Sequence, residues 1–445
     1  MQVLLTHNTD WLGKYRGSGP VVLKPKTTQE VSSILKYCND NSIAVVPQGG
    51  NTGLVGGGVP VRDEIVLSTS LMQTIESFDP VSGILTCQAG CILESLDGYL
   101  ADRGFCMPLD LGAKGSCQIG GNIATNAGGI RFVRYGSLHG TVLGLEVVLP
   151  DGTVVDTISP CRKDNTGYDI KQLFIGSEGT LGVVTRASLL TSSRASAVNV
   201  ALLGCESYES VVELLAQARG MLGEVVSAVE FLDDSCMDVI QTNLPGGTNP
   251  LSANYPFYFL VETSGSNNDH DTEKLNKYLE SVIESGVCVD GTVAMDTTQQ
   301  KALWAIREEI SGALLGDGYV YKYDISLPVS KMYDIVEDMR KRCEGLTVRV
   351  CGYGHIGDGN LHLNITSKEY NPELLAKIEP YVYEYTAGEN GSVSAEHGLG
   401  YMKSKCIHYS KSPAAVTLMH QIKSLFDPKG ILNPYKLLPP NSANK

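Results

Sequence analysis

Three glycine-rich segments in the first 190 residues constrain the fold of this chain more than any other feature. They are PQGGNTGLVGGG (47–58), GAKGSCQIGGNIATNAGG (112–129) and GSEGTLG (176–182). Glycine lets a backbone approach a phosphate closely and turn its N–H groups outward as an anion nest. One such segment alone is more often a structural loop, but three in one region each cost folding entropy. Together they favour a site for a phosphate-bearing cofactor.

Strands and helices alternate between these segments. VVLKP (21–25) is typical of a strand, Thr27 and Glu30 have capping-box spacing, and apolar positions from Val31 to Cys38 mark one helical face. IAVV (43–46) follows as a strand that we expect to stop at Pro47. The order predicts a compact β-α-β unit. Further on, LGLEVVLPDGTVVDT (143–157) predicts a hairpin that turns at residues 150–152.

The pattern changes from about Asn199 onward. Strand-like NVALLG, AVEFL and YFLVET alternate with helices expected near 207–219, 233–242 and 271–284. This predicts a second α+β domain whose antiparallel sheet is covered on one side. The fold class is therefore α+β, with a two-part first domain, this second domain and a small, mainly helical C-terminal region.

Composition excludes several classes of protein. A chain of 445 residues is too long for one core and predicts two or three domains. The net charge of −14 comes without the basic stripe that a nucleic-acid binder needs. There is no run of about 18 apolar residues to form a transmembrane segment. None of the twelve cysteines forms a C-x-x-C pair, which favours a reducing compartment.

Two nucleotide-binding motifs can be tested directly. The P-loop pattern G-x-x-x-x-G-K-[ST] does not occur. A G-x-G-x-x-G match does occur at Gly352, Gly354 and Gly357, after strand-like VRVC. The next residues, DGNLHLNI, alternate like another strand, so the helix that would bind a pyrophosphate is missing. We reject this match as a dinucleotide fingerprint.

Three of the eight histidines lie close together in the sequence instead. If NLHLNI is a strand, His362 and Asn364 point to one face, and His355 reaches that face across a Gly-Asp-Gly turn. Glu396 and His397 follow about thirty residues later. Two imidazoles and a carboxylate suit a catalytic Zn²⁺, although Mn²⁺, Co²⁺ or Fe²⁺ would also fit. The absence of H-E-x-x-H counts against an ordinary metalloprotease.

The longest motifs resemble one known family. PQGGNTGL, PLDLGAKGSCQIGGNIATNAGG, RYGSLHGTVLGLEVVLPDG and KQLFIGSEGTLG are similar to the FAD-binding domain of the vanillyl-alcohol oxidase/p-cresol methylhydroxylase superfamily. Within it they resemble the branch of D-lactate and D-2-hydroxyglutarate dehydrogenases. With GYGHIGDGNLHLN, SAEHGLG and DPKGILNPYK, the likeness to the D-2-hydroxyglutarate enzymes covers nearly the whole chain.

The resemblance implies an FAD site. Residues 49–54 would wrap the pyrophosphate, the 115–129 and 176–184 segments would line the flavin, and Asn433 would return to support it. Because no histidine lies between His7 and His139, a covalent link has no obvious attachment point, and we predict non-covalent FAD. The implied cofactor-binding residues are Gly49, Gly50, Asn51, Thr52, Gly53, Leu54, Pro108, Gly115, Gly120, Gly121, Thr125, Asn126, Gly128, Gly182, Val184 and Asn433.

The resemblance also implies a metal-assisted oxidation. His355, His362 and Glu396 would be the metal ligands, and the metal would lower the pKa of the substrate hydroxyl. His397 would be the general base, because an imidazole pKa suits proton abstraction, while a supporting hydrogen bond is its other interpretation. The C2 hydride would go to N5 of FAD. The implied substrate-binding residues are Arg307, Ser311, Lys322, Asn364 and His397, with serine at 311 where we expect threonine.

These implications give one hypothesis, the oxidation of (R)-2-hydroxyglutarate to 2-oxoglutarate. Its regions would be residues 1–207 for FAD, 208–386 for substrate and 387–445 to complete the active site. The resemblance also implies a mitochondrial matrix location and an electron-transfer flavoprotein as electron acceptor. Because such relatives carry an N-terminal targeting segment, we interpret this sequence as a mature or trimmed form.

Three rival hypotheses stay open. The nearest is the same chemistry on D-lactate or another D-2-hydroxy acid. Arg307 and Lys322 argue against it, because two cations indicate a substrate with a second carboxylate. Another is a flavin-free zinc hydrolase that uses His355, His362 and Glu396, which leaves the glycine segments unexplained. The third is a metal-dependent binding module without turnover.

Overall fold

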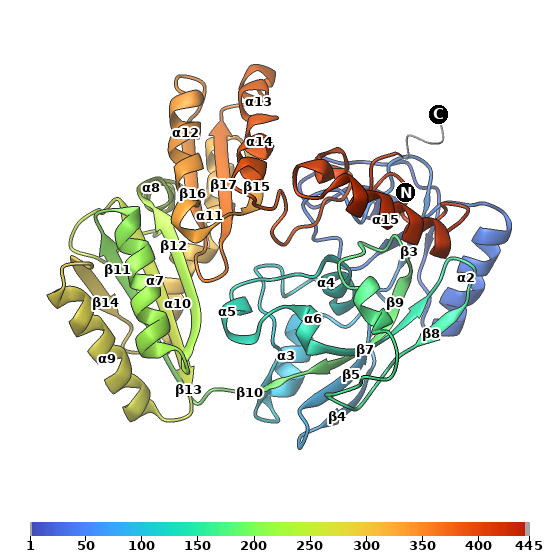
Figure 1. Cartoon of the computed structure of the whole chain (residues 1–445), viewed down its shortest axis with the longest axis horizontal. Helices are drawn as coiled ribbons and strands as arrows, with labels where there is room; N and C mark the ends of the chain where they lie inside the picture. The colour runs from blue at the N-terminus through green and yellow to red at the C-terminus, as the bar shows by residue number, and fades with distance from the viewer. Residues whose placement is uncertain (1, 441–445) are drawn as a thin grey trace. The chain divides into compact units, whose positions relative to one another are not determined.

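The computed structural model describes residues 2–440, which form two compact units. Unit 1 consists of Met1–Gly129, Tyr135–Arg194 and Glu396–Lys445. Unit 2 consists of Ile130–Arg134 and Ala195–Ala395. The sequence predicts three regions, and the residues from Glu396 onward group with the first of them. Each unit has its own sheets, as Figure 1 shows, and no helix in the described part of the chain is long and apolar enough to cross a membrane.

Unit 1 begins with the predicted β-α-β arrangement. Strands β1 (Val22–Leu23) and β2 (Val45–Gln48) lie on either side of β3 (Ile65–Ser68) in a parallel sheet. Helix α2 (Thr28–Asp40) connects β1 to β2. Its N-cap residue is Thr27, whose side chain accepts a hydrogen bond from the N–H of Glu30 (3.2 Å). This confirms the predicted cap.

The expected end of β2 before Pro47 is wrong, since the strand continues through Pro47 to Gln48. The N–H of Val45 points away from β3, because it donates to Ile431 (2.8 Å). Residue 47 faces the same side as residue 45, so β3 does not need the N–H group that proline lacks.

A five-stranded antiparallel sheet completes unit 1, in the order β4-β5-β9-β7-β8. The predicted hairpin at 143–157 is its β7-β8 pair. Helices α3 (Leu93–Ala101) and α4 (Ile119–Thr125) share the apolar core of this sheet. The strands are β4 (Ile75–Asp79), β5 (Ile84–Gln88), β7 (Val142–Val148), β8 (Val154–Asp156) and β9 (Val183–Leu190).

The C-terminal segment packs into the core of unit 1. Ile431 and Leu432 are buried with α2 and β2, and Leu432 forms a parallel bridge to Val45. Lys423 of α15 (Pro413–Phe426) donates to the carbonyl of Leu432 (2.8 Å). The remaining elements of this unit are α1 (Gln2–Asn8), β6 (Phe105–Cys106), α6 (Leu138–Thr141), η1 (Ile170–Leu173), β10 (Ser192–Ser193) and η4 (Ser404–Tyr409).

Unit 2 is built on a seven-stranded antiparallel sheet in the order β14-β11-β13-β12-β16-β17-β15. All three predicted strands belong to it, as β11, β12 and β13. The strands are β11 (Ala197–Cys205), β12 (Val226–Asp233), β13 (Phe257–Gly265), β14 (Asp290–Val293), β15 (Tyr319–Ser326), β16 (Arg349–His355) and β17 (Asn360–Ser367).

Helices cover both faces of this sheet, so the expected cover on one side is wrong. Helices α7 (Tyr208–Leu222) and α9 (Asn268–Glu284) pack together against β11 and β13 (Figure 1). Helices α8 (Asp234–Asn243) and α10 (Thr297–Glu308) share a core with Val200 and Leu202 of β11. The alternate residues Ala201 and Leu203 are also buried. Continuous apolar runs such as NVALLG are typical of strands buried on both faces.

The short segment Ile130–Arg134 belongs to unit 2 although unit 1 residues flank it on both sides. Its anchor is Arg131, which pairs with the buried Glu262 of β13. The other elements that include unit 2 residues are α5 (Phe132–Tyr135), α11 (Ile310–Ala313), η2 (Leu314–Asp317), η3 (Val329–Lys331), α12 (Asp334–Arg342), α13 (Pro372–Ile378) and α14 (Tyr381–Gly388).

Candidate active site

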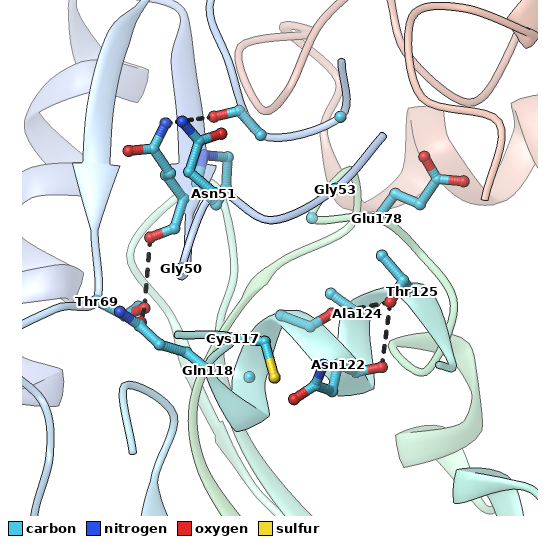
Figure 2. A pocket seen from close by; sticks show the side chains of 18 of the residues that line it. Gly50, Asn51, Gly53, Thr69, Cys117, Gln118, Asn122, Ala124, Thr125 and Glu178 are labelled. Atoms are coloured by element: carbon cyan, nitrogen blue, oxygen red, sulfur yellow. Dashed lines mark hydrogen bonds between the residues drawn. The ribbon is translucent and has the colours of Figure 1, made fainter. Parts of the chain in front are cut away.

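The three glycine-rich segments line one pocket, which lies wholly within unit 1 (Figure 2). It holds about 980 Å³ of empty space, including space open to solvent, which is at the upper end of the roughly 300–1,000 Å³ usual for small-molecule sites. Residues of the segments that line it are Pro47 to Gly53, Val55, Gly57, Gly58, Cys117, Gln118, Gly120 to Asn122, Ala124, Thr125, Glu178, Gly179 and Gly182.

Close packing holds the 49–54 loop, whose residues 49–53 line this pocket. A Cβ atom on Gly50 would lie 2.1 Å from the carbonyl oxygen of Ser116, so only glycine fits there. Asn51 has a left-handed backbone (φ 54°), and its side-chain amide donates to the carbonyl of Thr9 (2.8 Å). A Cβ on Gly53, by contrast, would meet nothing within 4 Å. The loop is therefore fixed on its inner side and open on its pocket side.

Ten of the sixteen predicted cofactor-binding residues line the pocket. They are Gly49, Gly50, Asn51, Thr52, Gly53, Gly120, Gly121, Thr125, Gly182 and Val184. The six outside its lining are Leu54, Pro108, Gly115, Asn126, Gly128 and Asn433. Of these, Asn433 donates from its side-chain amide to the carbonyl oxygens of Glu178 (2.7 Å) and Gly57 (3.1 Å), so it supports two lining residues from behind.

Several polar lining residues were missed by the sequence analysis. Thr69 donates its hydroxyl to the amide oxygen of Gln118 (2.6 Å), and its N–H donates to the carbonyl of Gln48 (3.0 Å). These contacts tie β2, β3 and the start of α4 together in the lining of the pocket. The only signal in the sequence is the position of Gln48 and Gln118 inside two of the predicted glycine-rich segments.

Glu178 is another missed residue, in the middle of GSEGTLG. It has a left-handed backbone (φ 52°), and burial raises its pKa above the ordinary value. Its carboxylate accepts the N–H groups of Leu399 (2.8 Å) and Gly400 (2.7 Å), which hold the segment after His397 in unit 1. His397 itself lines the pocket. A buried acid thus brings the predicted base to the edge of the glycine-rich pocket.

In unit 2 the predicted histidine strand pairs with the strand before it. His355 ends β16 and His362 lies in β17, and their ring centroids are 5.2 Å apart. The two strands are antiparallel and joined by a short turn at 356–359. Since Gly352, Gly354 and Gly357 thus belong to a hairpin and precede no helix, the rejection of a dinucleotide fingerprint is confirmed.

His362 and Asn364 share a face of β17, as predicted. Their partners in register on β15 are Asp324 and Lys322, while Leu361 and Leu363 are fully buried on the other face. The amide oxygen of Asn364 is buried and has no hydrogen-bond partner among the described residues. An orphaned acceptor of this kind is costly unless a ligand or water donates to it.

The predicted carboxylate-binding residues also lie in unit 2. Lys322 donates from Nζ to the hydroxyl of Ser311, and burial lowers the pKa of Lys322 to about 8. The guanidinium of Arg307 lies 4.7 Å from the ring centroid of Tyr353, whose partner in register is His362. Burial raises the pKa of Tyr353, so this phenol stays neutral. The structure therefore brings the cations Arg307 and Lys322 to the same sheet that carries the histidines.

The third predicted metal ligand, Glu396, is the first residue of the last segment of unit 1, directly after Ala395 of unit 2. Its carboxylate accepts the N–H of Gly129 (2.7 Å), at the end of the second glycine segment. The set of three metal ligands stays a prediction.

Comparisons with known proteins show which family the chain belongs to. Residues 194–437 match the family described as FAD linked oxidases, C-terminal domain, and residues 20–158 match the FAD binding domain. The mitochondrial D-2-hydroxyglutarate dehydrogenase of Danio rerio is 61% identical over 439 residues, which cover 99% of this chain and 82% of the relative. That of Bos taurus is 59% identical, over 97% and 79% of the two chains. The chain belongs to the D-2-hydroxyglutarate dehydrogenase family of FAD-linked oxidases.

A protein of low sequence identity shares the fold of this FAD-linked oxidase. A solved structure of alkyldihydroxyacetonephosphate synthase matches it with a TM-score of 0.74 at 16% identity, over 97% of this chain and 82% of the other. The α+β fold and the family resemblance predicted from the motifs are thus confirmed. The chain is an FAD-dependent dehydrogenase.

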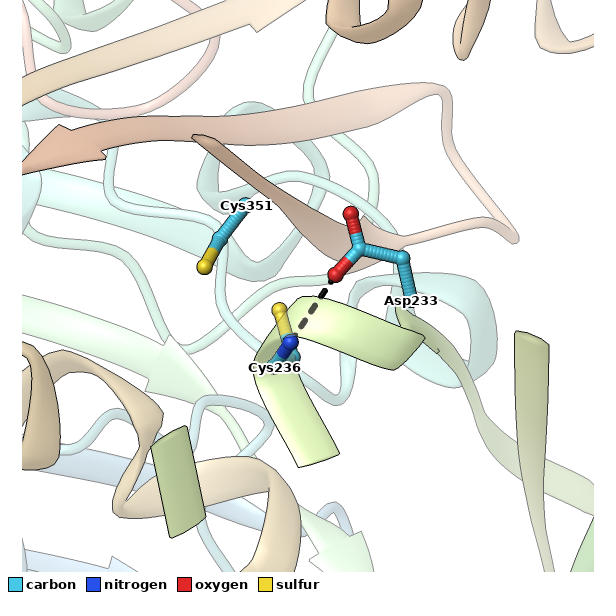
Figure 3. Close-up of side chains that lie close together, drawn as sticks. All are labelled: Asp233, Cys236 and Cys351. Carbon is cyan, nitrogen blue, oxygen red and sulfur yellow. Dashed lines mark hydrogen bonds between the residues drawn. The ribbon is translucent and has the colours of Figure 1, made fainter. Parts of the chain in front are cut away.

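The FAD-linked oxidase contains a second group of potential metal ligands, Asp233, Cys236 and Cys351, which are fully buried in unit 2 (Figure 3). The carboxylate of Asp233 accepts hydrogen bonds from the N–H of Cys236 (3.0 Å), the N–H of Gly352 (2.7 Å) and the guanidinium of Arg340 (2.9 Å). Burial raises the pKa of the Cys236 thiol. With a guanidinium already pairing the only carboxylate, we interpret the group as the cap of α8.

Proposed function

We propose that this chain catalyses the FAD-dependent oxidation of D-2-hydroxyglutarate to 2-oxoglutarate. The observation that carries the proposal is the identity of 61% over 99% of the chain to a dehydrogenase named for this substrate. Two features of the structure support it. The glycine-rich pocket of unit 1 fits a large cofactor, and unit 2 supplies two cations for a dicarboxylate, the buried Arg307 and the half-buried Lys322.

The pocket residues fit FAD by their shape and donors. Backbone at Gly53 and at Gly121 is open on the pocket side, which lets a pyrophosphate approach closely. Among the described histidines His397 alone lines this pocket, and His7 instead pairs with the side chain of Gln48. This supports non-covalent binding. Bound FAD supplies the acceptor for the hydride that leaves C2 of the substrate.

His355, His362 and Glu396 would hold a divalent metal, for which Zn²⁺, Mn²⁺ and Co²⁺ are all suitable. The imidazole pair in unit 2 supports this donor set. Ala395, directly before Glu396, donates its N–H to the carbonyl of Asp324 (3.3 Å), and Asp324 is the partner of His362 in register. The bound metal supplies Lewis acidity that favours loss of the hydroxyl proton.

The chain's own residues then bind the acid and move the proton. Arg307 and Lys322, with the hydroxyl of Ser311, hold the distal carboxylate, because a guanidinium fork and an ammonium both favour a carboxylate. Asn364, whose amide oxygen is orphaned, contacts the reacting end of the substrate. His397, which lines the cofactor pocket, is the general base for the substrate hydroxyl.

The location and the electron acceptor are inferred from the relatives. The relatives from Danio rerio and Bos taurus are both named as mitochondrial, which supports a mitochondrial location for this chain. We infer from the family resemblance that an electron-transfer flavoprotein takes the electrons onward.

The visible spectrum of the purified protein under anaerobic conditions tests the proposal. A yellow protein that bleaches on adding D-2-hydroxyglutarate, and bleaches only slowly after chelation, is expected. A colourless protein that stays colourless with added FAD would instead favour a flavin-free zinc hydrolase. Binding of the acid without any bleaching would favour a binding module.

The choice between D-2-hydroxyglutarate and D-lactate rests on Arg307. In Arg307→Lys a positive charge remains beside the buried Glu230, which Arg307 contacts. The pair of parallel hydrogen bonds that a guanidinium can donate to a carboxylate is lost. Because a hydrogen bond to a charged group contributes about 1.5–3 kcal/mol, kcat/KM for D-2-hydroxyglutarate should fall roughly 10- to 150-fold. Turnover of D-lactate, which lacks the second carboxylate, is the control. An equal loss on both acids would remove Arg307 from the distal site.

A further inference from the structure

Glu230 of β12 connects two parts of the proposed site through a single carboxylate. Its side chain is only 1% exposed. One oxygen, Oε2, accepts a hydrogen bond from Nε of Arg307 (2.7 Å), and the other, Oε1, lies 2.7 Å from Nδ1 of His355. The two partners belong to different tasks, since Arg307 is proposed to hold the distal carboxylate of the substrate and His355 to hold the metal.

The contact with His355 determines which ring nitrogen carries the proton. A carboxylate only accepts hydrogen bonds, so Nδ1 of His355 carries the proton, and in the neutral ring the lone pair is then on Nε2. Metal-ligating histidines characteristically donate their other N–H to a carboxylate, which fixes the tautomer and the ring orientation. Because the ring centroid of His362 is only 5.2 Å away, this tautomer presents Nε2 of His355 beside a second imidazole.

The contact with Arg307 leaves the outer part of the guanidinium for a ligand. Only Nε is used by Glu230, and among the described residues Nη1 and Nη2 of Arg307 have no hydrogen-bond partner. The ring of Tyr353, 4.7 Å from the guanidinium carbon, supports the plane of the group. A guanidinium held at Nε and against a ring presents its two remaining nitrogens as a fork that matches a carboxylate.

We propose that Glu230 is a positioning residue that orients the metal ligand His355 and the substrate-binding Arg307 together. The proposal rests on the proposed function of this site and deepens it. Because both partners share one carboxylate, this side chain would fix the spacing between His355, which would hold the metal, and Arg307, which would hold the distal carboxylate. The enzyme would thereby favour a 2-hydroxy acid with a second carboxylate at a fixed distance from its reacting end.

Glu262 of β13 provides a matched control. It is a buried glutamate in the same sheet, and Arg131 pairs with it as Arg307 pairs with Glu230. Its other partners are Trp304, which donates from Nε1 (2.8 Å), and Ser227, whose hydroxyl donates to it (2.6 Å). None of these is a proposed ligand of the metal or substrate. A general cost of losing a buried charge should therefore appear equally in Glu262→Gln and Glu230→Gln.

The test compares Zn²⁺ affinity of chelator-stripped, FAD-loaded enzyme in competition with a chromogenic chelator. The glutamine side chain has only one acceptor oxygen, whereas Arg307 and His355 each donate to a separate oxygen of Glu230. Glu230→Gln should therefore weaken Zn²⁺ binding about 10- to 100-fold, as loss of the hydrogen-bond partner of a metal ligand does. Glu262→Gln should bind Zn²⁺ like the unaltered chain. Glu230→Asp, which keeps the charge but is one methylene shorter, should lie between. KM for D-2-hydroxyglutarate should rise in Glu230→Gln more than KM for D-lactate.

Equal Zn²⁺ affinities in Glu230→Gln and Glu262→Gln would overturn the positioning role, as would wild-type affinity in Glu230→Asp if the glutamine variant does not fold. In either case the unaltered chain would still bind Zn²⁺ and oxidise D-2-hydroxyglutarate, so the proposed function would stand. An unaltered chain that binds no Zn²⁺ and leaves D-2-hydroxyglutarate unoxidised would remove the proposed function and this inference together.

Discussion

Lys322 is the residue whose ionisation should control the pH dependence of substrate capture. Burial lowers its pKa from 10.5 to about 8, so the ammonium that would hold a carboxylate is lost above that pH. We expect kcat/KM for D-2-hydroxyglutarate to fall as pH rises through about 8, since this parameter reports ionisations of the free enzyme. Lys322→Arg should move this fall to higher pH, because arginine stays charged. An unchanged alkaline limb in Lys322→Arg would contradict the assignment.

The same shift in the pKa of Lys322 has the opposite effect on stability. In the folded chain the pKa is about 8, and in the unfolded chain it returns to the ordinary 10.5. Between these values the unfolded state binds more protons, so this group's contribution to stability rises with pH. The cost of burying the charge is fully present below pH 8 and disappears toward pH 10.5. Lys322→Met should therefore stabilise the chain against urea at about pH 7 more than at about pH 10.

The sequence indicated the charged residues of the site better than the residue that connects them. Arg307 and Lys322 were identified through the family resemblance. Glu230 was missed because its partners Arg307 and His355 lie 77 and 125 positions away. A signal was present, since Glu230 is the one charged residue inside the apolar run AVEFL. A charge in a fully buried strand must be paired, but the sequence does not give its partner.

At the scale of elements, two glycines of the loop at 49–54 should differ in their effect on stability, although both should contribute to FAD binding. In Gly50→Ala the new Cβ would lie 2.1 Å from the Ser116 carbonyl oxygen, so the loop must move and stability should fall by about 1–3 kcal/mol. In Gly53→Ala the Cβ meets nothing within 4 Å, so stability should be unchanged or slightly higher. FAD affinity should fall in both variants.

Thermal unfolding of the FAD-free protein and titration with FAD would measure these two effects separately. Gly104→Ala is not a suitable control, because that glycine has a left-handed backbone (φ 76°). Gly112 is suitable, since nothing lies within 4 Å of its Cβ position and it is outside the lining of the pocket. If Gly53→Ala binds FAD as tightly as Gly112→Ala does, the 49–54 loop is not in contact with the cofactor.

Most elements were predictable from periodicity, but their packing was not. The hairpin at 143–157 and the strands β11, β12 and β13 lie where alternation and apolar runs placed them. The second layer of helices on the large sheet was missed, although β12 is buried at every position. Local patterns show that a strand is apolar on both faces, whereas which helix covers each face depends on contacts between distant segments.

At the scale of the whole molecule, the proposed FAD pocket and the two proposed histidine ligands of the metal belong to different units. The FAD pocket is lined by unit 1 alone, and His355 and His362 lie in unit 2. Removal of the metal should therefore abolish turnover and leave FAD in place. Because Lewis-acid assistance contributes several kcal/mol, kcat should fall by at least about two orders of magnitude on chelation and in His362→Ala.

The measurement is the ratio of flavin absorbance to protein, taken beside turnover of D-2-hydroxyglutarate and metal content. The matched control is His270→Ala, because the His270 side chain in α9 is 61% exposed and far in sequence from the proposed ligands. That variant should keep flavin, metal and activity. Added Zn²⁺ should restore the chelated enzyme but not His362→Ala. Loss of FAD together with the metal would mean that unit 1 does not hold its cofactor independently, and the division of tasks between the two units would be wrong.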